Sequence, residues 1–213
     1  MDLSYIVAVH LIFVEARKDA MATRKQVMSA FATAKQRYAE ELGVDLRLKK
    51  VTKLKRDFSR RQRFSIYGSF PRFAKAFNYT LGRGWWYDNM VKLYVLPGLQ
   101  EGEIVYAGGI ANFCTYRTAK DFQEKPPVAV VFSPPAGRIN AKELLAITME
   151  HEVGHTICAS HYTKAFDPQT VMHPAALAFI DDLAAGVSTG IPDFLRFAPF
   201  SINEISKYLD SLK

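Results

Sequence analysis

The pattern of the first fifty residues limits the fold more than any other feature of this sequence. Tyr5–Val14 (YIVAVHLIFV) is almost wholly apolar, as expected for a strand that is buried on both faces. Thr23 and Gln26 then have the spacing of a helix capping box, and apolar residues recur at helical spacing as far as Leu42. Gly43 stands where a helix commonly ends. This segment therefore predicts a buried strand followed by one long helix.

A second strand is expected directly after that helix, because apolar and charged residues alternate over Val44–Lys49 (VDLRLK). When a helix crosses over between two strands of one sheet, the strands run parallel. The beginning of the chain thus indicates an α/β fold. Further strands are expected in four short runs rich in β-branched and aromatic residues, which lie between glycine and proline turns: Phe64–Tyr67, Met90–Leu96, Ile104–Tyr106 and Val128–Phe132.

Two more helices are expected in the second half of the chain. Asn140 and Glu143 form a start signal for a helix that runs into His151. Ser201 and Glu204 have the spacing of another capping box, followed by apolar residues along one face. The sequence therefore predicts a closing helix that begins near Ser201.

The composition is that of one globular domain covering residues 1–213. Its 49% hydrophobic content excludes a disordered or collagen-like chain, and two cysteines, Cys114 and Cys158, are too few for a disulfide-stapled mini-protein. The sequence leaves open whether they pair. Tyr5–Val14 is too short to span a membrane and lacks the positively charged flank of a signal peptide. We therefore expect a soluble protein, with its compartment and oligomeric state undecided.

The histidines are concentrated in one segment, with four of the five between positions 151 and 173. His151 and His155 lie four residues apart, so on a helix they are about 40° apart around the axis and can reach one ion from the same side. Glu152, beside the first histidine, is placed to hold a water on the open side of such an ion. With His161 as a third ligand, the segment predicts a metal site with an open position.

The spacing His151-Glu152-x-x-His155-x-x-x-x-x-His161 resembles the ligand motif of the metzincin zinc endopeptidases. Met172, eleven residues after the third histidine, is similar to the methionine of their Met-turn. The resemblance implies one catalytic zinc ion held by the three histidines, with Met172 beneath it. It also implies an endopeptidase in which Glu152 serves as general base and then general acid, acting on peptide or protein substrates.

The same resemblance implies a fold. It predicts a twisted, mostly parallel five-stranded sheet with an antiparallel edge strand, a long N-terminal crossover helix, an active-site helix and a C-terminal helix. An upper subdomain would cover about residues 1–160 and a lower one about 161–213. The run from Tyr106 to Ala111 is similar to the edge-strand region of the adamalysin branch, so the edge is expected within Ile104–Phe113. The candidate substrate-binding residues are Gly108, Gly109, Ile110 and Ala111.

One position departs from the metzincin pattern, because Cys158 stands where the family has glycine. If the helix continued, His161 would lie about 240° around the axis from His155 and would point away from the ion. The chain must therefore turn sharply near Cys158. Glycine adopts positive φ freely at such a turn, whereas another residue costs about 1 kcal/mol.

Two other ligand sets are compatible with the same segment. Cys158 follows His155 by three residues, so an unbroken helix would allow a structural His2Cys site that is closed by a fourth ligand and has no catalytic role. Alternatively, Asp181 or Asp182 would supply an acidic third ligand from a later helix. His173 is interpreted as a turn residue and His10 as a hydrogen-bonded core residue.

A basic segment suggests a different function. Lys49–Arg63 (KKVTKLKRDFSRRQR) holds eight basic residues and one acidic residue, so its net charge equals the +7 of the whole chain. Such a segment is typical of a solvated loop or a charged edge strand, but an acidic substrate or a nucleic acid would also bind it. Nucleic-acid binding should weaken steeply with salt and survive chelation, whereas metallopeptidase activity should be lost on chelation.

Overall fold

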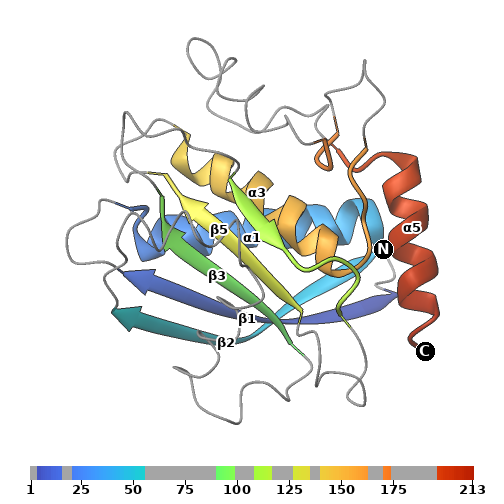
Figure 1. Ribbon diagram of the computed structural model, residues 1–213, viewed down its shortest axis with the longest axis horizontal. Coiled ribbons are helices and arrows are strands. Elements are labelled where there is room, and N and C mark those ends of the chain that lie inside the picture. The colour runs from blue at the N-terminus through green and yellow to red at the C-terminus, as the bar shows by residue number, and fades with distance from the viewer. Residues whose placement is uncertain are drawn as a thin grey trace.

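The computed structural model describes residues 4–15, 21–55, 90–98, 108–116, 127–134, 140–162, 170–173 and 196–213. Within these ranges, five strands form one sheet and three helices pack around it (Figure 1). The strands are β1 (Tyr5–Glu15), β2 (Val44–Lys55), β3 (Val91–Pro97), β4 (Gly109–Ala111) and β5 (Val128–Ser133). The helices are α1 (Arg24–Leu42), α3 (Ala141–Thr156) and α5 (Pro199–Asp210).

The predicted strand, helix and strand at the start of the chain are confirmed. Thr23 and Gln26 form the expected capping box, in which the Gln26 amide N–H donates to Thr23 Oγ1 and the Thr23 amide N–H donates to Gln26 Oε1. Gly43 ends α1 with a φ of 64°, in the left-handed region that favours glycine. β2 continues beyond the predicted Lys49 to Lys55 and pairs parallel with β1.

The sheet has the order β2-β1-β3-β5-β4. Neighbouring strands pair parallel except β4, which pairs antiparallel with β5 at the edge. The fold expected from the metzincin resemblance is therefore present: a mostly parallel five-stranded sheet with one antiparallel edge strand. The predicted strands Met90–Leu96 and Val128–Phe132 correspond to β3 and β5, whereas Phe64–Tyr67 and Ile104–Tyr106 lie outside the described residues.

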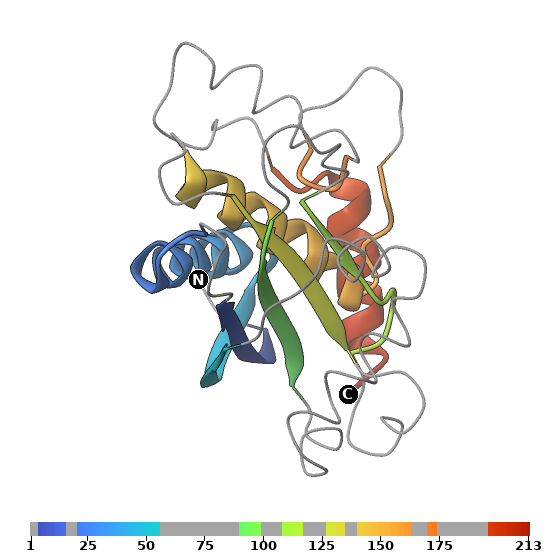
Figure 2. The same cartoon turned by 60° about the vertical axis from the view of Figure 1, so that its left-hand side comes forward.

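α1 and α3 cover the same face of the sheet and pack against each other (Figures 1 and 2). Alternate residues of the central strands point into this helix-covered core, while their neighbours form a second buried cluster on the other face. Strands buried on both faces carry near-continuous apolar runs, which explains the composition of Tyr5–Glu15. None of the helices in the described part of the chain is long and apolar enough to cross a membrane.

The starts of the two later helices differ in detail from the predictions. Asn140 precedes α3, as expected, but it lies in the left-handed region and its side chain makes no capping hydrogen bond. The capping box predicted at Ser201 is wrong, because α5 begins two residues earlier, at Pro199. Proline is favoured in the first turn of a helix because its missing N–H needs no partner there. Glu204 instead accepts hydrogen bonds from the amide and the hydroxyl of Ser160.

Candidate metal centre

Three histidine side chains converge at the C-terminal end of α3. The Nε2 atom of His151 lies 3.1 Å from that of His155 and 3.1 Å from that of His161, and the last two are 3.0 Å apart. Nitrogens that share one zinc ion at 2.0–2.1 Å are separated by roughly 3.3 Å in a tetrahedral site. The three imidazoles are therefore close to the arrangement that a single metal ion requires.

Two of these rings are oriented by backbone carbonyls. His151 Nδ1 lies 2.7 Å from the carbonyl oxygen of Val171, and His155 Nδ1 lies 2.7 Å from that of Ala159. A carbonyl can only accept a hydrogen bond, so each Nδ1 carries the proton and each Nε2 lone pair faces the common centre. Histidines that bind metals in proteins are oriented in this way. The donor set thus fits a divalent metal ion.

His161 reaches the centre because the chain turns at Cys158. Cys158 has a φ of 76°, the Ala159 amide donates to the Gly154 carbonyl, and the Cys158 amide donates to the His155 carbonyl. These bonds form a Schellman motif, the usual way in which a helix ends at a left-handed residue. The sharp turn predicted from the spacing of the histidines is present, with cysteine in the position that favours glycine.

Cys158 is joined to Cys114 by a disulfide, a pairing that the sequence left open. The same segments are also linked through the backbone, since the Cys114 amide donates to the His155 carbonyl and the amides of Thr115 and Tyr116 donate to that of Thr156. A cysteine in a disulfide offers no thiolate to a metal, so the His2Cys alternative is wrong. The bridge ties the residues after β4 to the turn that carries His161.

Glu152 lies on α3 beside His151 and packs against the edge strand. Its side chain is 5% exposed, and burial raises its pKa well above the ordinary value. The atoms of Glu152 are so close to β4 that a Cβ added at Gly109 would be 2.8 Å from Glu152 Oε1. The carboxyl group therefore lies against the strand predicted to bind substrate, on the helix that carries His151 and His155.

Burial keeps the histidines of the centre neutral. It lowers the pKa of His151 to about 3 and that of His155 to about 4, and it also lowers the pKa of His161. The neighbouring imidazoles act in the same direction, because a charged ring would repel the others. Neutral imidazoles have a free lone pair, so the site is held in the form that binds a metal.

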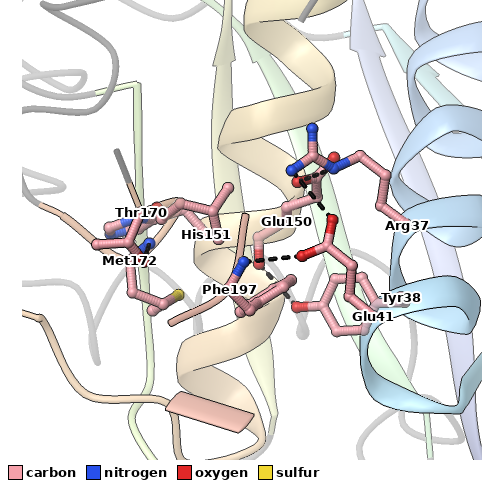
Figure 3. A network of polar contacts seen from close by, with 9 residues as sticks. Arg37, Tyr38, Glu41, Glu150, His151, Thr170, Met172 and Phe197 are labelled. Atoms are coloured by element: carbon pink, nitrogen blue, oxygen red, sulfur yellow. Dashed lines mark hydrogen bonds and ion pairs between the residues drawn. The ribbon is translucent and has the colours of Figure 1, made fainter. Parts of the chain in front are cut away.

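Met172 is fully buried close to the centre. A Cβ added at Gly154 of α3 would lie 3.0 Å from its sulfur, and the Tyr162 amide donates to its carbonyl oxygen at 3.2 Å. Figure 3 shows Met172 and His151 together on one side of α3. The segment 170–173 thus packs against the helix and contacts the residue after His161.

A polar network holds α3 on its other side (Figure 3). Arg37 of α1 lies between two carboxylates, 3.1 Å from Glu150 and 3.2 Å from Glu41. The Tyr38 hydroxyl donates to the Glu150 carbonyl at 2.7 Å, and Glu41 accepts from the Phe197 amide at 2.8 Å. These contacts join α1, α3 and the start of the C-terminal segment next to the first histidine. No sequence pattern indicates these contacts, because Arg37 and Glu150 lie far apart in the chain.

Several predicted residues take no part in the histidine cluster. Gly108, Gly109, Ile110 and Ala111 lie at the sheet edge. The His173 amide donates to the Thr170 carbonyl, in agreement with a turn residue, and His10 is buried and hydrogen-bonded to Thr52. Asp181 and Asp182 lie outside the described residues, as do positions 56–63 of the basic segment. The described part of that segment belongs to β2, where Lys53 pairs with Glu15, and nucleic-acid binding stays a prediction.

Comparison with known proteins agrees with this geometry. The sequence model of metallo-peptidase family M12 matches residues 2–176. No curated protein gives a sequence match. The structure is similar to the crystal structure of archaemetzincin from Methanopyrus kandleri, with 18% identity, a TM-score of 0.51 and coverage of 95% of this chain and 96% of that one. It is also similar to metalloproteinase-II from Bacteroides fragilis, with 11% identity and a TM-score of 0.57. This match covers 95% of this chain and 53% of that one. At such identities the structural likeness shows the fold alone.

Proposed function

Because this chain belongs to metallo-peptidase family M12, we propose that it is a zinc-dependent endopeptidase whose metal is held by His151, His155 and His161. The observation that carries the proposal is the triangle of Nε2 atoms, 3.0–3.1 Å apart. Three neutral ligands leave zinc an open position. Zinc bound there would lower the pKa of a water molecule and polarise the scissile carbonyl.

Glu152 is the proposed general base. Its carboxylate accepts a proton from the attacking water and then donates that proton to the leaving amine, so that no acyl-enzyme forms. Burial raises its pKa, so the carboxyl group holds the proton more firmly once it has accepted it. Met172 is proposed to support the centre from below, and its burial against α3 supports that role.

The substrate is proposed to bind as an extended peptide along β4. Among the described strands β4 is at the edge of the sheet and pairs with β5 alone, and an edge strand can pair with a bound peptide. Main-chain groups of residues 108–111 would form hydrogen bonds with the peptide. In this scheme residues 1–160 supply the sheet and the active-site helix, and residues 161–213 form a smaller lower part of the same domain.

A digest of a peptide library tests the proposal, run on the zinc-loaded protein with and without chelator. Cleavage within peptides should disappear with chelator and return when zinc is added back. Metal analysis of the purified protein should give one zinc ion per chain. Glu152→Ala should retain that zinc and lose hydrolysis, because the ligands remain and the general base is removed. Retained turnover in this variant would contradict the mechanism.

A second variant tests the third ligand. His161→Ala should lose metal affinity, since it removes one corner of the triangle. Unchanged zinc content in this variant would instead favour Asp181 or Asp182 as the third ligand.

A further inference from the structure

Gly109 of β4 lies in contact with Glu152. A Cβ added at Gly109 would be 2.6 Å from Glu152 Cγ and 2.8 Å from Glu152 Oε1. The same atom would be 2.5 Å from the carbonyl oxygen of Val130 in β5. Non-bonded carbon contacts are most favourable at about 3.5–4.0 Å, so no side chain fits at this position without a shift.

We propose that Gly109 is a positioning residue for the reaction. Because it has no side chain, the edge strand β4 can lie directly against the Glu152 carboxyl group. The inference rests on the proposed function, in which β4 binds the peptide and Glu152 moves the proton. It assigns Gly109 a role beyond offering backbone hydrogen bonds to a substrate.

The packing leaves two ways to accommodate a methyl group at Gly109, and both disturb the site. β5 is buried along its whole length, so its Val130 carbonyl cannot retreat. Either β4 moves away from β5, which shifts a bound peptide relative to Glu152, or the Glu152 side chain turns aside. Glu152 is itself 5% exposed, so it has little space for another rotamer. A misplacement of about 1 Å reduces the rate of the chemical step about 100-fold.

Gly98, at the end of β3, provides a matched control. A Cβ added there would be 2.6 Å from the carbonyl oxygen of Ser133, which also belongs to β5. Within the described structure it would meet no atom of Glu152. Gly98→Ala and Gly109→Ala therefore both press a methyl group against a carbonyl of β5, and only the second also contacts the proposed general base.

The first test measures kcat, KM and zinc content with one cleavable peptide. Gly109→Ala should keep its zinc and lose about 100-fold in kcat, with a smaller change in KM. Gly98→Ala should keep kcat within about two-fold, since it leaves the reacting groups in place. Normal kcat in Gly109→Ala, or an equal loss in Gly98→Ala, would overturn the inference.

The second test uses the metal-free protein and needs no activity. Glu152→Ala removes the two Glu152 atoms that the new methyl group would meet and leaves the Val130 carbonyl in place, so Gly109→Ala should lower the melting temperature less in the Glu152→Ala background than in the wild type. Gly98→Ala should lower the melting temperature by the same amount in the wild type and in the Glu152→Ala background. If Gly109→Ala lowers the melting temperature equally in the two backgrounds, or prevents folding in both, its effect comes from the Val130 carbonyl and the inference is overturned. If Glu152→Ala retained turnover, the proposed function would fail, while this coupling would still report the contact.

Discussion

Cys158 adopts a backbone conformation that few residues other than glycine adopt readily. Its φ of 76° is required because the chain must leave α3 at once if His161 is to face His155. A side chain in this region costs about 1 kcal/mol. The disulfide to Cys114 offsets this cost, because it restricts the unfolded chain between two cysteines that are 44 residues apart.

Two variants separate these contributions. Cys114→Ser removes the bridge and should lower the free energy of unfolding by about 3–4 kcal/mol. Adding Cys158→Gly to this variant should restore about 1 kcal/mol, because glycine relieves the left-handed conformation. Urea unfolding of the two variants measures the difference. A double variant less stable than Cys114→Ser would show that Cys158 is not strained.

His10 makes the stability of the protein dependent on pH. Burial, together with the charges of Lys92 and Lys50, lowers its pKa from 6.5 to about 4. Between these values the unfolded chain binds a proton that the folded protein does not, so stability falls as the pH decreases from about 6.5 to 4.

Replacement of His10 by asparagine tests this effect. The free energy of unfolding of the metal-free protein should depend less steeply on pH in His10→Asn, by up to about 1.4 kcal/mol per pH unit. The histidines of the metal centre also have lowered pKa values and should leave a residual slope in both proteins. Identical slopes in variant and wild type would contradict the assignment to His10.

At the scale of the elements, α3 is held between two sets of contacts. On one side the Val171 carbonyl orients His151. On the other side Arg37 pairs with the fully buried carboxylate of Glu150. Burial raises the pKa of this carboxyl group, whereas the Arg37 guanidinium 3.1 Å away lowers it and favours the charged form. The register of α3 relative to α1 thus depends on a buried ion pair one residue before the first histidine.

Removing one partner of this pair should be more harmful than removing both. Arg37→Met should lower the free energy of unfolding by about 3–5 kcal/mol, because it leaves the Glu150 carboxyl group buried without its cation. Adding Glu150→Gln should recover part of that loss, since a neutral amide replaces the acid. Denaturant unfolding measures both variants. If the double variant is as unstable as Arg37→Met, the loss comes from packing of the arginine side chain.

At the scale of the whole molecule, the metal centre joins the helix layer to the chain that follows it. Two of the proposed ligands belong to α3 and the third follows the turn at Cys158. The segment 170–173 contacts His151 through Val171 and the residue after His161 through Met172. C-terminal α5 is tied in as well, because Glu204 bonds to Ser160 just before His161. A metal ion that binds the folded protein and not the unfolded chain should therefore stabilise the whole fold.

Zinc should raise the free energy of unfolding by about 2.7 kcal/mol when its free concentration is 100 times its dissociation constant. Thermal unfolding of the chelated and the zinc-loaded protein measures this effect. In His161→Ala the same zinc concentration should give a much smaller increase. An undiminished increase would place the third ligand elsewhere in the chain.

The features determined by the sequence itself depend on residues close together in the chain. The capping box at Thr23, the helix end at Gly43 and the apolar run of β1 are local, so the strand, helix and strand could be predicted with their parallel pairing. The spacing of His151 and His155 is local as well, since helix geometry alone brings their rings to one side.

The tertiary structure decided the contacts that join residues far apart in the chain. Ser201 and Glu204 have the spacing of a capping box, yet Glu204 binds Ser160, because the fold brings that amide within reach. The bridge between Cys114 and Cys158, the ion pair of Arg37 with Glu150 and the contact of Gly109 with Glu152 likewise join separate elements. A hydrogen bond or close contact depends on atomic positions within a few tenths of an ångström, and only the packing of the complete chain sets these positions.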